Sequence, residues 1–158
     1  MKKYSIEIKW AGIYSLMTLL WMVIEKEVGL NDEYINKQDY AKTLMFLPII
    51  AVYIFALRDK RTNYYEGTMS YKQGLISGTI IAFLAAGISP LTQLITYKII
   101  SPEFFPNAIE CVVKEGAKKL QEAEQYFSLK NYIIRGIGGT VVVGVVISSI
   151  VAIFARKK

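Results

Sequence analysis

Uncharged apolar runs alternate with charged segments along the chain, and this alternation predicts its helices. Four of the runs are 15 to 25 residues long. About 20 apolar residues are needed to cross the hydrocarbon core of a bilayer. We therefore predict one all-α integral membrane domain over residues 1–158 with four transmembrane helices. The predicted spans are residues 4–24, 41–57, 73–97 and 132–155.

Between the third and fourth spans the pattern changes, because apolar residues recur every three or four positions opposite a charged face. This period predicts an amphipathic helix over about residues 106–127, and Ser128 is a suitable cap for the last span. The side chains expected to make contacts on this outer helix are Phe104, Phe105, Ile109, Val112, Val113, Leu120 and Phe127. Five acids and five lysines between Lys98 and Lys130 argue against a polybasic surface for nucleic acid or anionic lipid.

Small residues recur at steps of four in the last two spans. The residues predicted to pack helices are Gly74, Gly78, Ala82 and Ala86 in the third span and Gly136, Thr140, Gly144, Ser148 and Ala152 in the fourth. Helices in lipid associate where small side chains let their backbones approach. The two ribbons can pack on each other, which we favour, or on a second copy of the chain.

Composition and charge add an orientation. The chain is 53% hydrophobic with a mean hydropathy of +0.32 and a net charge of +6. Lysines and arginines cluster at both termini and between the second and third spans, which predicts that these segments are cytoplasmic. The outer helix would then face away from the cytoplasm of a multi-pass inner-membrane protein. A cleavable signal peptide is disfavoured, because Glu7 and Lys9 interrupt the first apolar run.

Charged residues in the spans lie near the ends. Glu7, Lys9, Lys42, Lys98 and Arg135 are within about two helical turns of a span end, where long side chains can reach water. No carboxylate is expected at mid-membrane, and the chain has no detectable internal repeat. Both observations weigh against a proton-coupled transporter.

Candidate chemistry is sparse, since the chain has no histidine and a single cysteine. We therefore expect no catalytic constellation, cofactor, metal or nucleic-acid partner, and no enzymatic activity. Cys111 could be an activated nucleophile if Lys114 lowered its pKa, but a small buried residue is favoured. The glycines of residues 136–139 lack the preceding strand of a phosphate-binding loop.

Several stretches resemble an uncharacterised family of small four-span inner-membrane proteins from Bacteroidetes, known only as a domain of unknown function. They are Trp21-Met22 with Glu25 and Gly29-Leu30, residues 67–78, residues 88–91, residues 100–105, and Tyr126-Phe127 before Asn131-Tyr132. The resemblance covers nearly the whole chain and implies a fold and a compartment. It offers no substrate, cofactor or active residues to carry over, only a weak association with cell-envelope lipid or glycan chemistry.

Two functions are compatible with these patterns. The favoured one is a non-enzymatic scaffold or accessory subunit, whose small-residue ribbons and outer helix bind a membrane-protein partner or a second copy. The alternative is a protein that binds a membrane lipid or polyprenyl carrier, in which Phe104, Phe105 and the outer helix gate a cleft between spans. A cleft beneath the outer helix would favour the second hypothesis.

Overall fold

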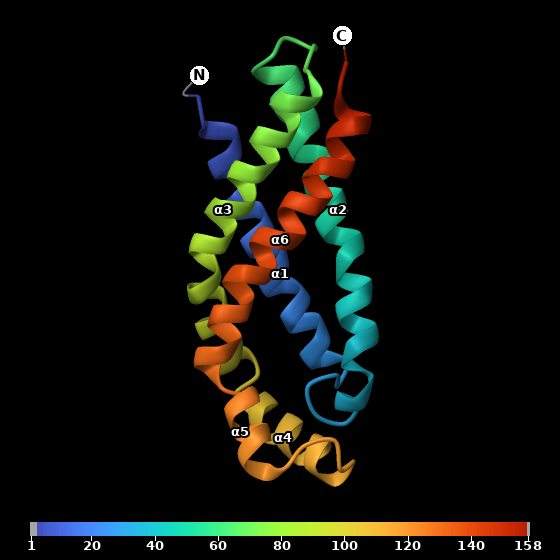
Figure 1. Cartoon of the computed structure of the whole chain (residues 1–158), viewed down its shortest axis with the longest axis vertical. Helices are drawn as coiled ribbons and strands as arrows, with labels where there is room; N and C mark the ends of the chain where they lie inside the picture. Colours follow the sequence, from blue (N-terminus) through green and yellow to red (C-terminus); the bar gives the residue numbers. More distant parts are fainter. Residues whose placement is uncertain (1–2, 158) are drawn as a thin grey trace.

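The computed structural model describes residues 3–157 as a bundle of long helices with two short helices at one end (Figure 1). The elements are α1 (Ser5–Glu27), η1 (Ile35–Lys37), α2 (Gln38–Asn63), α3 (Tyr71–Ile95), η2 (Thr96–Ile100), α4 (Phe104–Lys114), α5 (Leu120–Tyr126) and α6 (Leu129–Ala155). η1 is a 3-10 turn, and η2 is a π-helical turn that continues α3.

Four of these helices are long and apolar enough to cross a membrane, which confirms the predicted all-α fold with four transmembrane helices. They are α1, α2 with η1, α3 with η2, and α6, and each overlaps one predicted span. The helices extend beyond most of the predicted ends. α2 continues to Asn63, so Arg58, Lys60 and Arg61 belong to its last turns instead of to a loop. The chain is a multi-pass helical membrane protein.

The distribution of side-chain size agrees with a lipid environment. Large apolar side chains point outward from the bundle, as at Leu16 and Phe154, which are 68% and 80% exposed. Alanines such as Ala56, Ala82 and Ala152 are buried instead. Lipid tails are as apolar as these side chains, so packing the helices together gives no hydrophobic gain. Close packing of small residues holds such helices together instead.

α3 and α6 cross along most of their length, and this crossing brings the two ribbons of small residues together (Figure 1). A methyl group added to Gly78 would lie 2.6 Å from Ser148 Cβ, and one added to Gly144 would lie 2.5 Å from Ala82 Cβ. Any larger side chain at either glycine would force the helices apart. The ribbons are therefore used within one chain.

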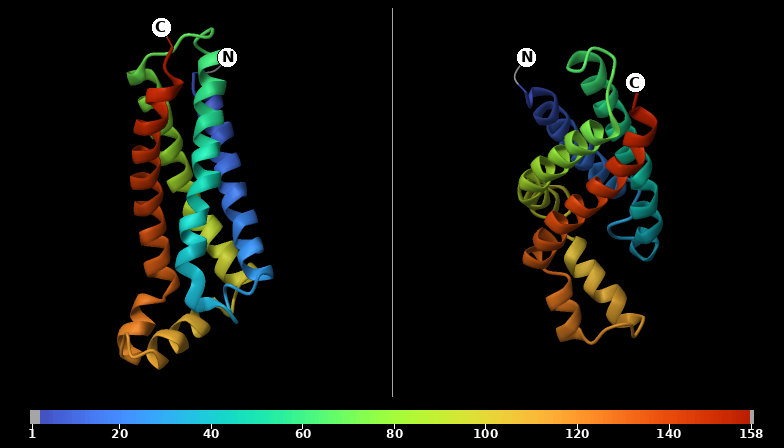
Figure 2. Two further views of the ribbon diagram at one scale, coloured as in Figure 1. Left: turned by 90° about the vertical axis from the view of Figure 1, so that its right-hand side faces the viewer. Right: turned by 45° about the horizontal axis from the view of Figure 1, so that its top comes forward.

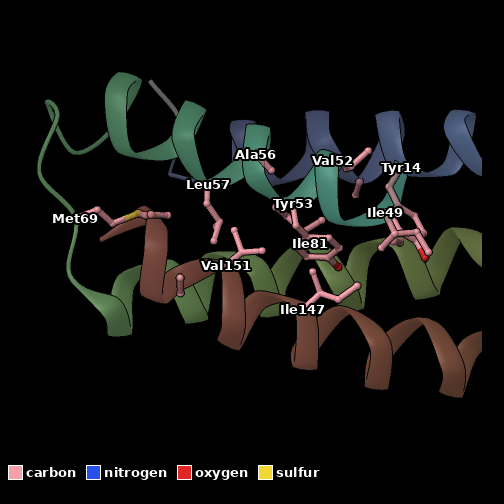
Figure 3. Packing of buried hydrophobic residues seen from close by; sticks show 14 residues of the cluster. Tyr14, Ile49, Val52, Tyr53, Ala56, Leu57, Met69, Ile81, Ile147 and Val151 are labelled. Carbon is pink, nitrogen blue, oxygen red and sulfur yellow. The ribbon is translucent and has the colours of Figure 1, made fainter. Parts of the chain in front are cut away.

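Larger side chains fill the space between α2 and the α3–α6 pair (Figure 3). Tyr53 and Leu57 of α2 are fully buried there, and Ile81 of α3 and Ile147 of α6 pack against the same cluster. The Tyr53 ring meets the Tyr14 ring of α1 edge-on at 6.3 Å between centroids. All four long helices thus contribute to one core.

The two ends of the bundle differ. Both termini and the loop between α2 and α3 gather at one end, here called the terminal end (Figures 1 and 2). Met69 in that loop and Lys157 exchange two backbone hydrogen bonds of 2.9 Å, which fix the end of the chain against the loop. The short helices α4 and α5 lie at the opposite end, here called the lid end (Figure 2).

A buried ion pair lies at the terminal end. The sequence predicts instead that charged side chains near the span ends reach water. The Lys60 ammonium is 2.9 Å from Glu7 Oε1, and the two side chains are only 3% and 2% exposed. Ser77 donates a further hydrogen bond of 2.8 Å to the same carboxylate, and Lys60 also donates to the Lys3 carbonyl oxygen at 2.7 Å. The prediction was wrong for Glu7, because its charge is compensated across helices, which sequence spacing does not show. The other four charged residues of that prediction, Lys9, Lys42, Lys98 and Arg135, are exposed.

The outer helix is also different from the prediction, since α4 and α5 replace one helix over residues 106–127. The chain turns at Gly116, whose φ of +69° is in the left-handed region that glycine tolerates best. The amides of Gly116 and Ala117 donate to carbonyl oxygens at the end of α4, which closes its last turn. α4, the turn and α5 form a V-shaped unit over residues 104–126, here called the lid.

Candidate functional site

A cleft opens between α2 and α6 directly beneath the lid, with a volume of about 420 Å³. Side chains from α1, α3, η2 and α5 also reach it, so every long helix and the lid contribute to its walls. A cleft between transmembrane helices is a common position for a ligand site, particularly where apolar walls carry a few polar groups. We therefore take this cleft as the candidate site.

The mouth of the cleft at the lid end carries two basic side chains, Lys42 from α2 and Arg135 from α6. Lys42 pairs with the exposed Asp39 at 3.3 Å, one turn nearer to the lid end. Arg135 Nη2 donates to the Tyr126 carbonyl oxygen of the lid at 2.7 Å, and its guanidinium lies 3.8 Å from the centre of the Tyr126 ring. Both positive groups are thus directed toward the lid-side mouth, where an anion could meet them.

The deeper wall is apolar and open. Met45, Phe46 and Ile49 line it from α2, and Val143 lines it from α6. Gly139 forms part of the same wall, and no atom lies within 4 Å of the position of an added methyl group there. The side chains of this part of the cleft match the chemistry of a hydrocarbon chain.

One polar group in the wall lacks a partner. Gln93 of α3 lines the cleft beside Gly136 of α6, and across residues 3–157 its buried Oε1 accepts no hydrogen bond. Neighbouring Tyr14 and Thr140, by contrast, share a side-chain hydrogen bond. An unpaired amide oxygen is unfavourable in a buried position, and this oxygen has less than 1 Å² of accessible surface, so it does not face the cleft.

A cluster of aromatic rings attaches the lid to the bundle above the cleft. It consists of Tyr97, Phe104, Phe105, Phe127 and Tyr132, with centroid distances such as 4.6 Å from Tyr97 to Phe105 and 5.3 Å from Tyr97 to Tyr132. Tyr97 belongs to the π-helical turn η2, and such turns frequently occur at functional sites. Two rings of the cluster, Tyr97 and Tyr132, also line the cleft.

A smaller hollow of about 270 Å³ lies on the lid side of the cleft. It shares the lining residues Lys42, Tyr126 and Tyr132 with the cleft, so the two spaces meet at the basic mouth. The hollow then continues between η1 and the lid, past Lys118 and Glu115. A ligand with its tail in the cleft would have room for a polar head at the lid surface.

A second polar contact holds the lid to the loop after α1. The buried side chain of Asn31 donates to Ser101 Oγ at 2.8 Å, and Asn107 of α4 donates to the Asn31 carbonyl oxygen at 3.1 Å. Gln38 at the start of α2 donates to Asn31 Oδ1 at 3.3 Å. One asparagine therefore links the segments on both sides of the cleft mouth.

The predicted helix-packing residues divide between two places. Gly136 and Thr140 line the cleft, and a methyl group at Gly136 would also lie 2.7 Å from Gln93 Nε2. The other seven are buried in α3 or α6: Gly74, Gly78, Ala82, Ala86, Gly144, Ser148 and Ala152. The fourth-span ribbon thus packs against α3 and also reaches the candidate site.

The predicted contact residues of the outer helix do not share one face. Phe104, Phe105 and Phe127 point into the aromatic cluster, and Phe104 is buried. Ile109 and Val112 are half-buried, whereas Val113 and Leu120 are exposed. The break at Gly116 separates the two halves of the predicted stripe. Its phenylalanines anchor the lid.

The environment of Cys111 opposes a role as a nucleophile. Burial and the nearby Glu115 carboxylate raise the pKa of the Cys111 thiol. Lys114 lowers this pKa by less, and it pairs with Glu110 at 2.5 Å. The thiol is half-buried on the lid, where the protonated form dominates at neutral pH.

Sequence reasoning did not connect the residues of the cleft. Lys42, Gln93 and Arg135 each stood out only as a polar residue in or near a span, and more than 40 positions separate each from the next. The charges gave no signal for these residues, because other basic residues such as Lys98 and Lys130 lie at the same end.

Comparison with known families gives one match. Residues 9–157 match the model of the family described as protein of unknown function (DUF4199), so the chain belongs to that family. The predicted resemblance to a domain of unknown function is thereby confirmed. No curated protein and no solved structure matches the chain.

Proposed function

We propose that this protein is a non-enzymatic accessory protein that binds one anionic lipid from the leaflet on the lid side. The observation that carries the proposal is the cleft between α2 and α6, which combines a basic mouth with an apolar wall. A lipid has the same division, since a phosphate group is followed by hydrocarbon chains. The site offers a position for each part.

The basic mouth suits a phosphate at the height of the lipid headgroups. Lys42 and Arg135 lie one to two turns inside α2 and α6, which is the depth of a membrane interface. Each basic side chain near an anionic headgroup contributes about 1 kcal/mol of attraction. Arg135 can also engage two phosphate oxygens through its planar guanidinium.

The small-residue ribbons no longer support a partner surface, because they are buried against each other in the α3–α6 crossing. This was the main feature behind the scaffold hypothesis. Lipid binding instead uses the cleft between α2 and α6, which the described side chains leave open. For this reason we place lipid binding ahead of the scaffold role.

A matched pair of glycines tests the proposal. Gly139 lines the cleft, whereas Gly138 is displaced by about 100° around α6. A methyl group meets no atom within 4 Å at either position, so neither substitution begins with a clash at Cβ. Gly139→Leu should fill the cleft, and Gly138→Leu should project away from it.

The measurement is native mass spectrometry of the purified full-length protein, titrated with phosphatidic acid in mild detergent. We expect Gly139→Leu to weaken binding about tenfold or more, equivalent to ~1.4 kcal/mol, and Gly138→Leu to bind like the original protein. Lys42→Gln should weaken binding roughly fivefold, whereas Lys130→Gln, also at the lid end, should not. Equal binding by all four variants would contradict the proposal.

We further propose that the protein lies in the bacterial inner membrane with both termini in the cytoplasm. The basic clusters at the terminal end support this orientation. Because Cys111 is the single cysteine and lies on the lid, a membrane-impermeant maleimide should label it in intact spheroplasts. In a Cys111→Ser background, Lys72→Cys should be labelled only after permeabilisation. The reverse pattern would place the lid in the cytoplasm.

A membrane-protein partner or a second copy of the chain is our second proposal. Its support is the exposed pair Val113 and Leu120, which leaves apolar surface on the lid beyond the aromatic cluster. Leu120→Glu should then release a stoichiometric partner in a mild-detergent pull-down, while Gln121→Glu should retain it. Recovery of a monomer without a partner from the unmodified protein would count against this role.

A further inference from the structure

A second groove lies between α2 and α6, nearer to the terminal end than the cleft. It has a volume of about 220 Å³ and shares no lining residue with the cleft. Two buried residues of α6, Val151 and Ala155, form its floor, and Figure 3 shows Val151 between α2 and α6. Ile150 and Phe154 form its rim and are exposed, which places the groove on the outer surface of the bundle.

The α2 side of the groove is an apolar stripe that ends in a charge. Ile50, Ile54 and Arg58 recur every four residues and all line the groove, which therefore runs about 12 Å along the helix. Arg58 is at the terminal end of this stripe, whereas Ile50 is in the middle of α2. A lipid of the leaflet on the terminal side has the same polarity, since its headgroup lies at the interface and its hydrocarbon chains point toward the midplane.

The charge of Arg58 is free, unlike the charges of its basic neighbours on α2. Lys60 is buried in its ion pair, and Arg61 Nη1 donates to the Ala155 carbonyl oxygen at 2.9 Å, which ties α2 to α6 beside the groove. Within residues 3–157 the exposed guanidinium of Arg58 makes no hydrogen bond and no ion pair. Because a guanidinium can hold a phosphate through two parallel N–H donors, Arg58 offers an anion contact that the described chain does not use.

We propose that this groove binds one anionic phospholipid from the leaflet on the terminal side, with the phosphate on Arg58 and part of one acyl chain along Ile54 and Phe154. The groove is separate from the cleft, and its occupancy does not depend on the proposed function. Pockets that enclose a whole small molecule have volumes of roughly 300 Å³ or more, so most of the lipid stays in the bilayer. The free cation should favour an anionic lipid over a zwitterionic one, whose headgroup carries its own positive charge.

Photo-crosslinking in vesicles measures this preference at the groove itself. The full-length protein is reconstituted into phosphatidylcholine vesicles that contain a trace of either phosphatidylglycerol or phosphatidylcholine with a diazirine in its acyl chain, and adducts are located by peptide mass spectrometry. We expect the phosphatidylglycerol probe to label residues 150–155 about fivefold more than the phosphatidylcholine probe, equivalent to ~1 kcal/mol. Equal labelling by the two probes would overturn the proposal. Label on Val143 reports the cleft instead, so the two sites are read independently.

A matched pair of charge variants tests the role of Arg58. Arg58→Gln should reduce the phosphatidylglycerol label at residues 150–155 to the level of the phosphatidylcholine probe, and Arg58→Lys, which keeps the charge, should retain most of the preference. Lys72→Gln removes an exposed charge at the same end that does not line the groove, so it should behave like the original protein. If Lys72→Gln lowers the label as much as Arg58→Gln does, general surface charge explains the preference and the proposed site is wrong.

A second pair of variants tests the apolar part. Ile150→Trp should fill the groove and remove the label on Phe154 from both probes. Ile153 is a similarly exposed residue of α6 outside the groove, so Ile153→Trp should leave that label in place. Persistence of the Phe154 label in Ile150→Trp would mean that the acyl chain does not occupy the groove.

Discussion

The ion pair at the terminal end and the cleft at the lid end place polar groups in different environments. At the terminal end, Glu7, Lys60 and Ser77 satisfy one another across three helices, and their side chains are buried. At the lid end, Lys42 and Arg135 border an open cleft, and Gln93 has an unpaired oxygen in its wall. Burial therefore separates polar groups that hold this bundle together from Lys42 and Arg135, which are exposed and remain available to a ligand.

The packing of the helices follows the same division. Toward the terminal end, α3 and α6 approach so closely that a methyl group at Gly74 would lie 3.2 Å from Ala152 Cβ. Toward the lid end, Gly138 and Gly139 have no atom within 4 Å of an added methyl group. Close packing of α6 against α3 continues to Gly136, so the room at the lid end lies in the seam between α2 and α6.

The largest effect is expected at the ion pair. Lys60→Met leaves the Glu7 carboxylate buried without its cation, which should lower the free energy of unfolding by about 3–5 kcal/mol. Lys42→Met, at the cleft mouth, should change it by less than about 1 kcal/mol, because its pair with Asp39 is exposed. Unfolding in mixed detergent micelles, followed by circular dichroism, measures both.

A double variant separates the charge from the shape of the side chains. Glu7→Gln with Lys60→Met removes both charges and should recover most of the lost stability, since a buried pair is often replaceable by uncharged groups. If the double variant is as unstable as Lys60→Met alone, the stability lost at the terminal end comes from packing of the lysine stem and not from charge pairing.

The second largest effect is expected for substitutions of glycines toward the two ends of the bundle. Gly78→Leu should lower stability by about 1–3 kcal/mol, because the new side chain overlaps Ser148 in the α3–α6 crossing. Gly139→Leu should cost no stability and should affect lipid binding alone. Thermal unfolding and lipid titration of the two variants would then give opposite profiles. Similar stability losses at both positions would remove the contrast between a packed and an open end.

The features that sequence predicted are local in the chain. Apolar run length was sufficient for the four spans, and the four-residue step of small residues marked positions that are now buried in α3 and α6. Ser128 could be assigned as a cap, and its side chain does accept the Asn131 amide at 3.3 Å. These features depend on residues that are neighbours along one helix, so spacing alone reveals them.

The features that sequence missed depend on contacts between helices. Glu7 and Lys60 are 53 positions apart and looked like separate charges at span ends. The cleft likewise requires that α2 and α6 diverge beneath the lid, which no local pattern encodes. The prediction of one continuous outer helix failed for a local reason. Gly116 can occupy a helix or a turn, and the sequence does not reveal that its backbone here is left-handed.

The smallest effect should come from Tyr53, whose hydroxyl is buried in the core and, in the part of the chain that the structure covers, has no hydrogen-bond partner. Tyr53→Phe removes that unpaired hydroxyl and keeps the ring against Tyr14, so we expect stability to stay the same or to rise by up to about 1 kcal/mol. Because Tyr53 does not line the cleft, lipid affinity should be unchanged. A loss of lipid binding in Tyr53→Phe would mean that the buried Tyr53 hydroxyl affects the cleft. Burial would then not separate structural polar groups from those that face a ligand.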